Sequence, residues 1–254
     1  MIPELAAAIQ NGEAVVLATV VRTHRSVPRR HGSKMLVFAD GRTVGTIGGG
    51  LMEHRVELEA ATALSEGTPR LLSYALVDPS DGDPGVCGGE VEIYLEPYMP
   101  SPTLFVIGAG HVGKAVVDLG HWLGLRVLLW DDRADLIDGL GELDTVEGVH
   151  TGAIEKVLDS QTITSADSIV MVTRNVALDV EILPHLLATS AGYVGLMGSN
   201  RRWVTTRAAL VESGAAEADL DRIHAPIGIE IHAETPEEIA VSILAEVIGN
   251  RHVD

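Results

Sequence analysis

At 254 residues the chain is long enough to bury two modest hydrophobic cores, since domains usually contain roughly 100 to 200 residues. Apolar residues make up 46% of the sequence and charged residues 21%, a balance that is typical of a folded globule and excludes a coiled coil or a disordered tail. The formal charge of −18 argues against binding to nucleic acid or to an acidic membrane surface, because those polyanions repel an acidic protein.

A single cysteine, Cys87, excludes an internal disulfide and a Cys-rich metal site built by one chain, and we expect no metal site. No apolar run reaches the roughly 18 to 20 residues that cross a bilayer, and residues 1–10 lack the basic and apolar regions of a signal peptide. The sequence therefore predicts a cytoplasmic protein with a free thiol.

Residues 1–99 are expected to form a small α+β domain. A short helix over 2–10 ends at a turn signal, and a second helix over 51–66 ends at Gly67. Strands are expected over 14–22, 34–38, 43–47, 70–76 and 90–95. Prolines at positions 97, 100 and 102 then mark a linker, because proline cannot continue a strand ladder.

Residues 103–254 alternate strand and helix patterns, which predicts a Rossmann-type doubly wound parallel sheet covered by helices on both faces. Apolar strands are expected over 104–107, 126–130, 168–172 and 193–197, with helices over 111–123 and 178–188. The last helix is expected to begin with Pro236, because Thr235 can cap it and Glu238 can close a capping box.

A GxGxxG pattern follows the first strand of this half and opens a helix, which is the context in which the pattern indicates nucleotide binding. Gly108 permits a tight turn, Gly110 lets a phosphate approach the backbone, and Gly113 lets the helix pack close to the strand. His111 lies at the helix start, and Asp131 follows the second strand, where an acid accepts bonds from ribose hydroxyls. Alternatively the glycines only allow tight packing, and no catalytic base can be assigned from spacing.

A second Gly-rich segment, Gly198 and Ser199, follows a strand and leads into a helix that begins with Arg201 and Arg202. Strand ends at the carboxyl edge of such a sheet line the ligand crevice, so this segment could hold an anionic group. Alternatively Ser199 caps the helix and both arginines are solvated.

The first half carries two further candidate binding segments. Arg29 lies in the acid-free stretch 22–34 and could present a planar fork to a phosphate or a carboxylate. Three consecutive glycines, Gly48, Gly49 and Gly50, mark a special turn or the close approach of a ligand. The alternative is a solvated basic loop and a turn that only begins a helix.

Cys87 is followed by two glycines in a polar loop, where we expect an exposed thiol with a catalytic or sulfur-handling role. Asp78, Asp81 and Asp83 disfavour a thiolate, so activation requires the basic loop to lie close to Cys87 in space. The alternative is a buried cysteine that acts as a small apolar residue.

Taken together, these segments resemble the XdhC/CoxI family, accessory factors that mature the molybdenum cofactor of xanthine dehydrogenase and carbon monoxide dehydrogenase type enzymes. The resemblance spans nearly the whole chain. It rests on residues 26–29, 32–35, 45–50, 53, 87–89, 96–97, 108–113, 131–133, 198–199, 222–228 and 235–239.

The resemblance implies a protein that binds the molybdenum cofactor (molybdopterin), protects it while a cysteine desulfurase adds a sulfido ligand, and delivers it to a xanthine dehydrogenase-type hydroxylase. On this interpretation Cys87 contacts the cofactor or its sulfur, and the basic loop around Arg29 clamps a phosphate. NAD or another nucleotide could occupy the Rossmann half.

Three positions depart from the family pattern, in which a His is common at position 174, an Asp at 230 and a Gly at 232. This chain has Arg174, Glu230 and His232 there, so its ligand or chemistry could differ. Two alternatives stay open: an NAD(P)-dependent oxidoreductase with His111, Arg174 or His232 near the substrate, and a non-catalytic nucleotide-sensing partner of a hydroxylase. The sequence also leaves open the target enzyme, the nucleotide and whether the chain forms a homodimer.

Overall fold

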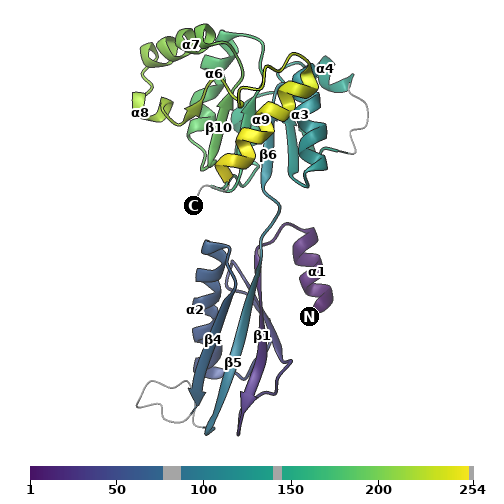
Figure 1. The fold of residues 1–254 in the computed structure, drawn as a ribbon, viewed down its shortest axis with the longest axis vertical. Helices are drawn as coiled ribbons and strands as arrows, with labels where there is room; N and C mark the ends of the chain where they lie inside the picture. Colours follow the sequence, from purple (N-terminus) through teal and green to yellow (C-terminus); the bar gives the residue numbers. More distant parts are fainter. Residues whose placement is uncertain (77–86, 140–144, 252–254) are drawn as a thin grey trace. The chain divides into compact units, whose positions relative to one another are not determined.

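The computed structural model describes residues 1–76, 87–139 and 145–251 (Figure 1). The chain divides into two compact units, Met1–Pro100 and Ser101–Asp254, and the division falls within the proline-marked segment 97–102. Each unit has its own sheet and its own buried clusters. Across the described ranges, no helix is both long and apolar enough to cross a membrane.

The first unit is a five-stranded antiparallel sheet in the order β3-β2-β1-β5-β4, with one helix on each face (Figure 1). Its elements are α1 (Ile2–Gln10), β1 (Val15–His24), β2 (Lys34–Phe38), β3 (Thr43–Gly45), α2 (Gly50–Glu66), β4 (Arg70–Leu76) and β5 (Gly89–Tyr98).

The central strand β1 supplies both cores of this unit, because successive side chains of a strand point to opposite faces. Val16, Ala18 and Val20 pack under α2, whereas Val15 and Leu17 pack under α1. The alternation of apolar residues along β1 is therefore not a buried/exposed alternation but a two-sided one.

The second unit is a six-stranded parallel sheet in the order β11-β10-β9-β6-β7-β8, which confirms the predicted doubly wound α/β fold. Its strands are β6 (Thr103–Ile107), β7 (Arg126–Trp130), β8 (Gly148–His150), β9 (Ser168–Met171), β10 (Tyr193–Leu196) and β11 (Ile223–His224). Its helices are α3 (His111–Trp122), α4 (Ala134–Asp138), α5 (Ile154–Asp159), α6 (Val176–Leu187), α7 (Asn200–Glu212), α8 (Glu217–Leu220) and α9 (Pro236–Arg251).

Helices cover both faces of this sheet, and each face has its own buried cluster. Helices α3 and α9 lie side by side over one face (Figure 1), where Val116 and Val117 of α3 pack in the same cluster as Ile243 and Leu244 of α9. Residues of α5, α6 and α7 form the cluster on the other face. The predicted capping box of α9 is present, because Thr235 Oγ1 accepts from the N–H of Glu238 at 3.2 Å while Glu238 Oε2 accepts from the N–H of Thr235 at 3.0 Å.

The short elements of this unit, α4, β8, α5, α8 and β11, do not emerge from the sequence pattern. Each contains only two to six residues, which is too few for a hydrophobic period to be recognised. They complete the two edges of the sheet and leave its centre as predicted.

Candidate functional site

The strand order of the second unit places a ligand crevice at the end of β6. The chain passes from β6 outward to β7 and β8, and then returns to β9 on the other side of β6. Ligands bind outside the carboxyl ends of the strands where the order reverses in this way. The predicted glycine turn begins at this point, directly after Ile107.

A cavity of about 150 Å³ lies at this reversal. Its lining comes from the turn after β6, the end of β7 and the segment after β9: Gly108, Gly110, Trp130, Asp131, Asp132, Arg133, Val172, Thr173, Arg174 and Leu178. The cavity is smaller than the roughly 300 Å³ of common ligand pockets, so a nucleotide bound here would extend beyond it.

The three glycines of the turn differ in what the fold itself requires of them. Gly108 has a φ of 115°, and a Cβ there would lie 2.8 Å from the carbonyl oxygen of Val172. A Cβ at Gly113 would lie 1.8 Å from the carbonyl oxygen of Gly108, so no side chain fits there. A Cβ at Gly110 would meet nothing within 4 Å. Packing therefore explains Gly108 and Gly113 but not Gly110.

Asp131 is buried, with 1% of its surface exposed, and it holds the glycine turn in place. Its Oδ2 accepts from the N–H of Ala109 and from Arg133 Nη2, both at 2.8 Å. Its Oδ1 accepts from the N–H and the Nε of Arg133, at 2.9 and 2.8 Å. These four bonds use the roughly four acceptor positions of a carboxylate. The expected bonds from ribose hydroxyls to Asp131 therefore have no free acceptor, and this residue is a support of the turn.

The charge on Asp131 is secured by these bonds. Burial alone would raise the pKa of the Asp131 carboxyl, but the hydrogen bonds from Arg133 and from the N–H of Ala109 outweigh it and lower the pKa to about 2. The next residue, Asp132, lies in a different environment, with its side chain 31% exposed. Both of its oxygens face Arg174, at 2.8 and 2.7 Å from the two terminal nitrogens.

The second Gly-rich segment forms a structural junction in which an internal carboxylate meets Arg202. Ser199 Oγ caps α7 by accepting from the N–H of Arg202 at 3.2 Å. The Arg202 guanidinium forms a bidentate pair with the fully buried Asp179, at 2.7 to 2.9 Å, and donates to the carbonyl oxygen of Thr173 at 3.0 Å. Arg202 is therefore neither solvated nor available to an external anion beside Gly198, because the carboxylate of α6 already occupies it.

The glycine triplet of the first unit also binds an internal anion. Glu53 Oε1 accepts from the N–H groups of Ile47, Gly48 and Gly49, at 3.0, 3.2 and 2.8 Å, and from Thr46 Oγ1 at 2.5 Å. Burial would raise the pKa of Glu53, but these hydrogen bonds outweigh it and hold the pKa below its usual value. The backbone concavity is thus occupied by Glu53, and Gly50 begins α2 with a φ of 64°.

The basic loop lies beside both other candidate segments of the first unit. A Cβ at Gly48 would lie 3.2 Å from the Pro28 side chain, and one at Gly89 would lie 2.1 Å from the carbonyl oxygen of Ser26. Strands β1 and β5 pair as far as His24 opposite Glu90, so the segment that carries Cys87 enters β5 where β1 ends.

Cys87 is exposed, as its polar, glycine-flanked surroundings in the sequence predict. The side chains of Arg25, Arg29 and Arg30 are exposed too, and they have no hydrogen bond or ion pair with the described residues. Asp78, Asp81 and Asp83, which were expected to oppose a thiolate, lie outside the described residues.

The three side chains expected near an oxidoreductase substrate do not share one place. Arg174 lines the cavity, but His111 and His232 are not among the lining residues. His111 is exposed at the first position of α3, and the side chain of His232 is 94% exposed beside Glu230. The described part of the chain therefore offers no histidine in the wall of this cavity.

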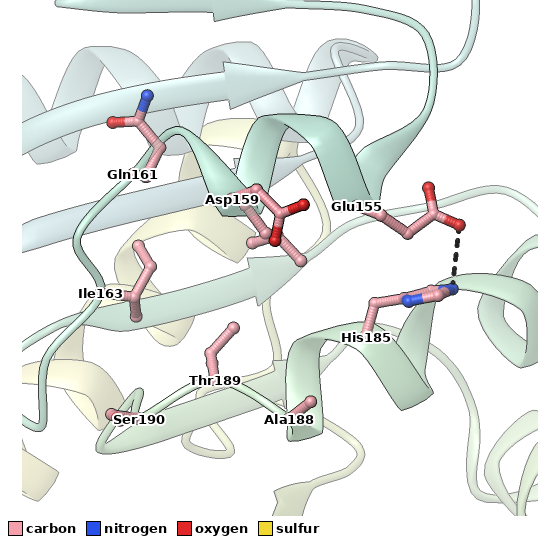
Figure 2. Close-up of a pocket in the computed structure, with 9 residues that line it drawn as sticks. Glu155, Asp159, Gln161, Ile163, His185, Ala188, Thr189 and Ser190 are labelled. Carbon is pink, nitrogen blue, oxygen red and sulfur yellow. Dashed lines mark ion pairs between the residues drawn. The ribbon is translucent and has the colours of Figure 1, made fainter.

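A larger cavity, of about 330 Å³, lies between α5 and α6. Figure 2 shows Glu155 and His185 pointing toward one another across its edge, and their Oε1 and Nε2 atoms are 3.2 Å apart. Ile163 and Ser190 line it from the segments that precede β9 and β10, so it lies at the amino ends of the strands. That is the opposite edge of the sheet from the glycine turn, and no motif in the sequence indicates it.

Comparison with protein families shows two matches that together cover most of the chain. Residues 104–247 match the XdhC Rossmann domain, and residues 8–75 match the XdhC and CoxI family. The chain belongs to the XdhC and CoxI family. Cys87 lies between the two matched ranges.

Several relatives are similar over most of the chain. An uncharacterized protein of Escherichia coli (strain K12), YqeB, is 34% identical over 91% of this chain, which spans only 42% of YqeB. A protein of Bacillus subtilis (strain 168) that is described as a probable xanthine dehydrogenase component is 22% identical over 97% of this chain and 96% of that protein. The molybdenum cofactor insertion chaperone PaoD of Escherichia coli (strain K12) is 23% identical over 96% of this chain and 86% of PaoD.

A solved structure supports the fold. The crystal structure of a xanthine dehydrogenase from Bacillus halodurans aligns with 98% of this chain and 95% of that chain, with a TM-score of 0.52 and 22% identity. At this level of identity the similarity concerns the fold alone.

Proposed function

We propose that the chain is an accessory protein for molybdenum hydroxylases of the xanthine dehydrogenase type, which holds the molybdenum cofactor during sulfuration and insertion. The observation that carries this proposal is the family membership, together with a relative named as a molybdenum cofactor insertion chaperone that aligns with 96% of this chain. Its partners would be a hydroxylase that receives the cofactor and a cysteine desulfurase that supplies sulfur.

The first unit has side chains that suit this cofactor. When bound, the cofactor supplies a metal centre with sulfur ligands and a phosphate. The exposed thiol of Cys87 is a soft ligand that suits such a metal centre, and the exposed Arg25, Arg29 and Arg30 suit the phosphate. The glycine triplet is not needed for this, because Glu53 already takes its N–H groups.

The proposal predicts that Cys87→Ser keeps the fold but reduces cofactor retention, because an exposed thiol contributes little to packing. Molybdopterin content would be measured on protein purified from its own host, along with activation of the partner hydroxylase. Arg29→Gln should lower retention as well, whereas Arg42→Gln, which removes the same charge beside Asp40 and Glu13, should not. Equal cofactor content in wild type and Cys87→Ser would remove this thiol from the proposal.

We also infer that the second unit binds a nucleotide phosphate at the turn before α3. The support is Gly110: the fold leaves room for a side chain there, but the sequence has none, and close approach of a phosphate to the backbone accounts for this. The oxidoreductase alternative has less support, because a hydride-transfer site needs a proton donor or acceptor, and the described residues place no histidine in this cavity.

Gly110→Val tests the nucleotide site directly. We expect a folded protein that has lost nucleotide affinity by about tenfold or more, because the side chain would occupy the place of the phosphate. Gly249→Val is the matched control, since a Cβ there also meets nothing within 4 Å and the position lies in α9. Calorimetry with adenine, guanine and cytosine nucleotides provides the measurement, and equal affinities in all three proteins would show that the turn holds no ligand.

A further inference from the structure

Two acidic residues follow β7, and their oxygens are used in different ways. All four acceptor positions of Asp131 are taken by Ala109 and Arg133. Asp132 receives only two hydrogen bonds, both from Arg174 and one to each oxygen. Because a carboxylate offers roughly four lone-pair positions, Asp132 keeps about two acceptor positions free.

The position of the Asp132–Arg174 pair gives these free acceptors a direction. Asp132 follows β7 and Arg174 lies after β9, and these two strands flank β6 on either side. The pair therefore crosses over the end of β6, and both residues line the same cavity as Gly108 and Gly110. A carboxylate at this edge of a doubly wound sheet, one strand away from a phosphate-binding turn, is where ribose hydroxyls are bound.

The two-point contact also fixes the orientation of the carboxylate. A guanidinium fork that meets both oxygens holds the carboxylate in one plane, which a single contact would not do. Both side chains are partly exposed, at 31% for Asp132 and 43% for Arg174, so a ligand can reach the free acceptors without unfolding the turn. Arg133 cannot replace Arg174, because it is committed to the buried Asp131.

We propose that Asp132 is the residue that determines ribose specificity in this crevice, and that Arg174 is its positioning residue. This rests on the proposed nucleotide site of the second unit. Asp132 accepts hydrogen bonds from the two hydroxyls of an unphosphorylated ribose while it remains paired with Arg174. A ribose that carries a 2′-phosphate is disfavoured, because its charge would face that of Asp132.

The proposal predicts an inversion of selectivity in Asp132→Asn. Wild type should bind NAD more tightly than NADP by about tenfold or more, because like charges oppose the phosphate. Asp132→Asn removes the opposing charge and frees the Arg174 guanidinium, so NADP should become the preferred ligand. Arg174→Met should weaken NAD binding several-fold without inverting the preference, because the carboxylate remains but is no longer oriented.

Titration calorimetry on the full chain would give both dissociation constants for each variant, with Asp135→Asn as the control that removes one exposed negative charge outside the cavity. Circular dichroism would verify that each variant is folded. An unchanged NAD-to-NADP ratio in Asp132→Asn, or tighter binding of NADP by wild type, overturns the specificity assignment but leaves the nucleotide site standing. Absence of binding in wild type and in every variant overturns both.

Discussion

At the residue scale, the neighbouring acids Asp131 and Asp132 illustrate how burial separates two equivalent side chains. Both follow β7, yet Asp131 is buried under the glycine turn and Asp132 is partly exposed at the cavity. A sequence pattern identifies the strand end but not which of two consecutive acids points inward. The assignment of the ribose contact therefore passes from Asp131 to Asp132 as a proposal.

The low pKa of Asp131 predicts how protein stability depends on pH. Its pKa is about 2 in the folded protein, against 3.8 for an unperturbed aspartate, so its contribution is fully present above pH 3.8 and is lost as the pH falls towards 2. Asp131→Asn should lower the free energy of unfolding by about 2 kcal/mol at neutral pH, and this difference should close by about pH 2. Urea unfolding at several pH values measures it, and a pH-independent difference would contradict the charge-based explanation.

At the element scale, the start of α2 shows a turn that is organised by a side chain from its own helix. The strand predicted over 43–47 ends at Gly45, because the backbone N–H groups that follow turn toward Glu53 and leave the β-ladder. Three consecutive glycines resemble a ligand site because the same geometry binds phosphate. The carboxylate that fills it lies three residues beyond the triplet.

This arrangement predicts that Glu53→Gln destabilises the first unit. The amide keeps one acceptor oxygen but loses the charge that strengthens four hydrogen bonds, so we expect a loss of about 1–3 kcal/mol in the free energy of unfolding. Glu57→Gln, one turn later on α2 beside His54, should change it by less than about 0.5 kcal/mol. Chemical denaturation followed by circular dichroism provides the comparison, and equal midpoints for the two variants would refute the anchoring role.

At the scale of the whole molecule, the chain carries its two candidate sites on separate units, each with its own cores. The cofactor-binding proposal rests on loops of the first unit and the nucleotide proposal on the sheet edge of the second. Because the two sets of residues do not overlap, Cys87→Ser and Gly110→Val separate the two functions experimentally.

The sequence by itself determined the features that depend on neighbours along the chain. The central strands, the longer helices, the capping box of α9 and the position of the glycine turn all follow from short-range periods and spacings. Family resemblance to XdhC and CoxI was also contained in the sequence, and both family matches confirm it. Short elements such as β8 and β11 were too brief to carry a period.

Only the tertiary structure decided which charged groups meet. Arg202 pairs with Asp179, Glu53 fills the glycine turn, and Arg174 crosses from β9 to Asp132. None of these partners can be read from spacing, because strand order places β9 and β7 on either side of β6 although 37 residues separate the end of β7 from the start of β9. Whether an arginine is committed to the fold or remains available to a ligand is therefore a property of the folded sheet, since it depends on how deeply its carboxylate partner is buried.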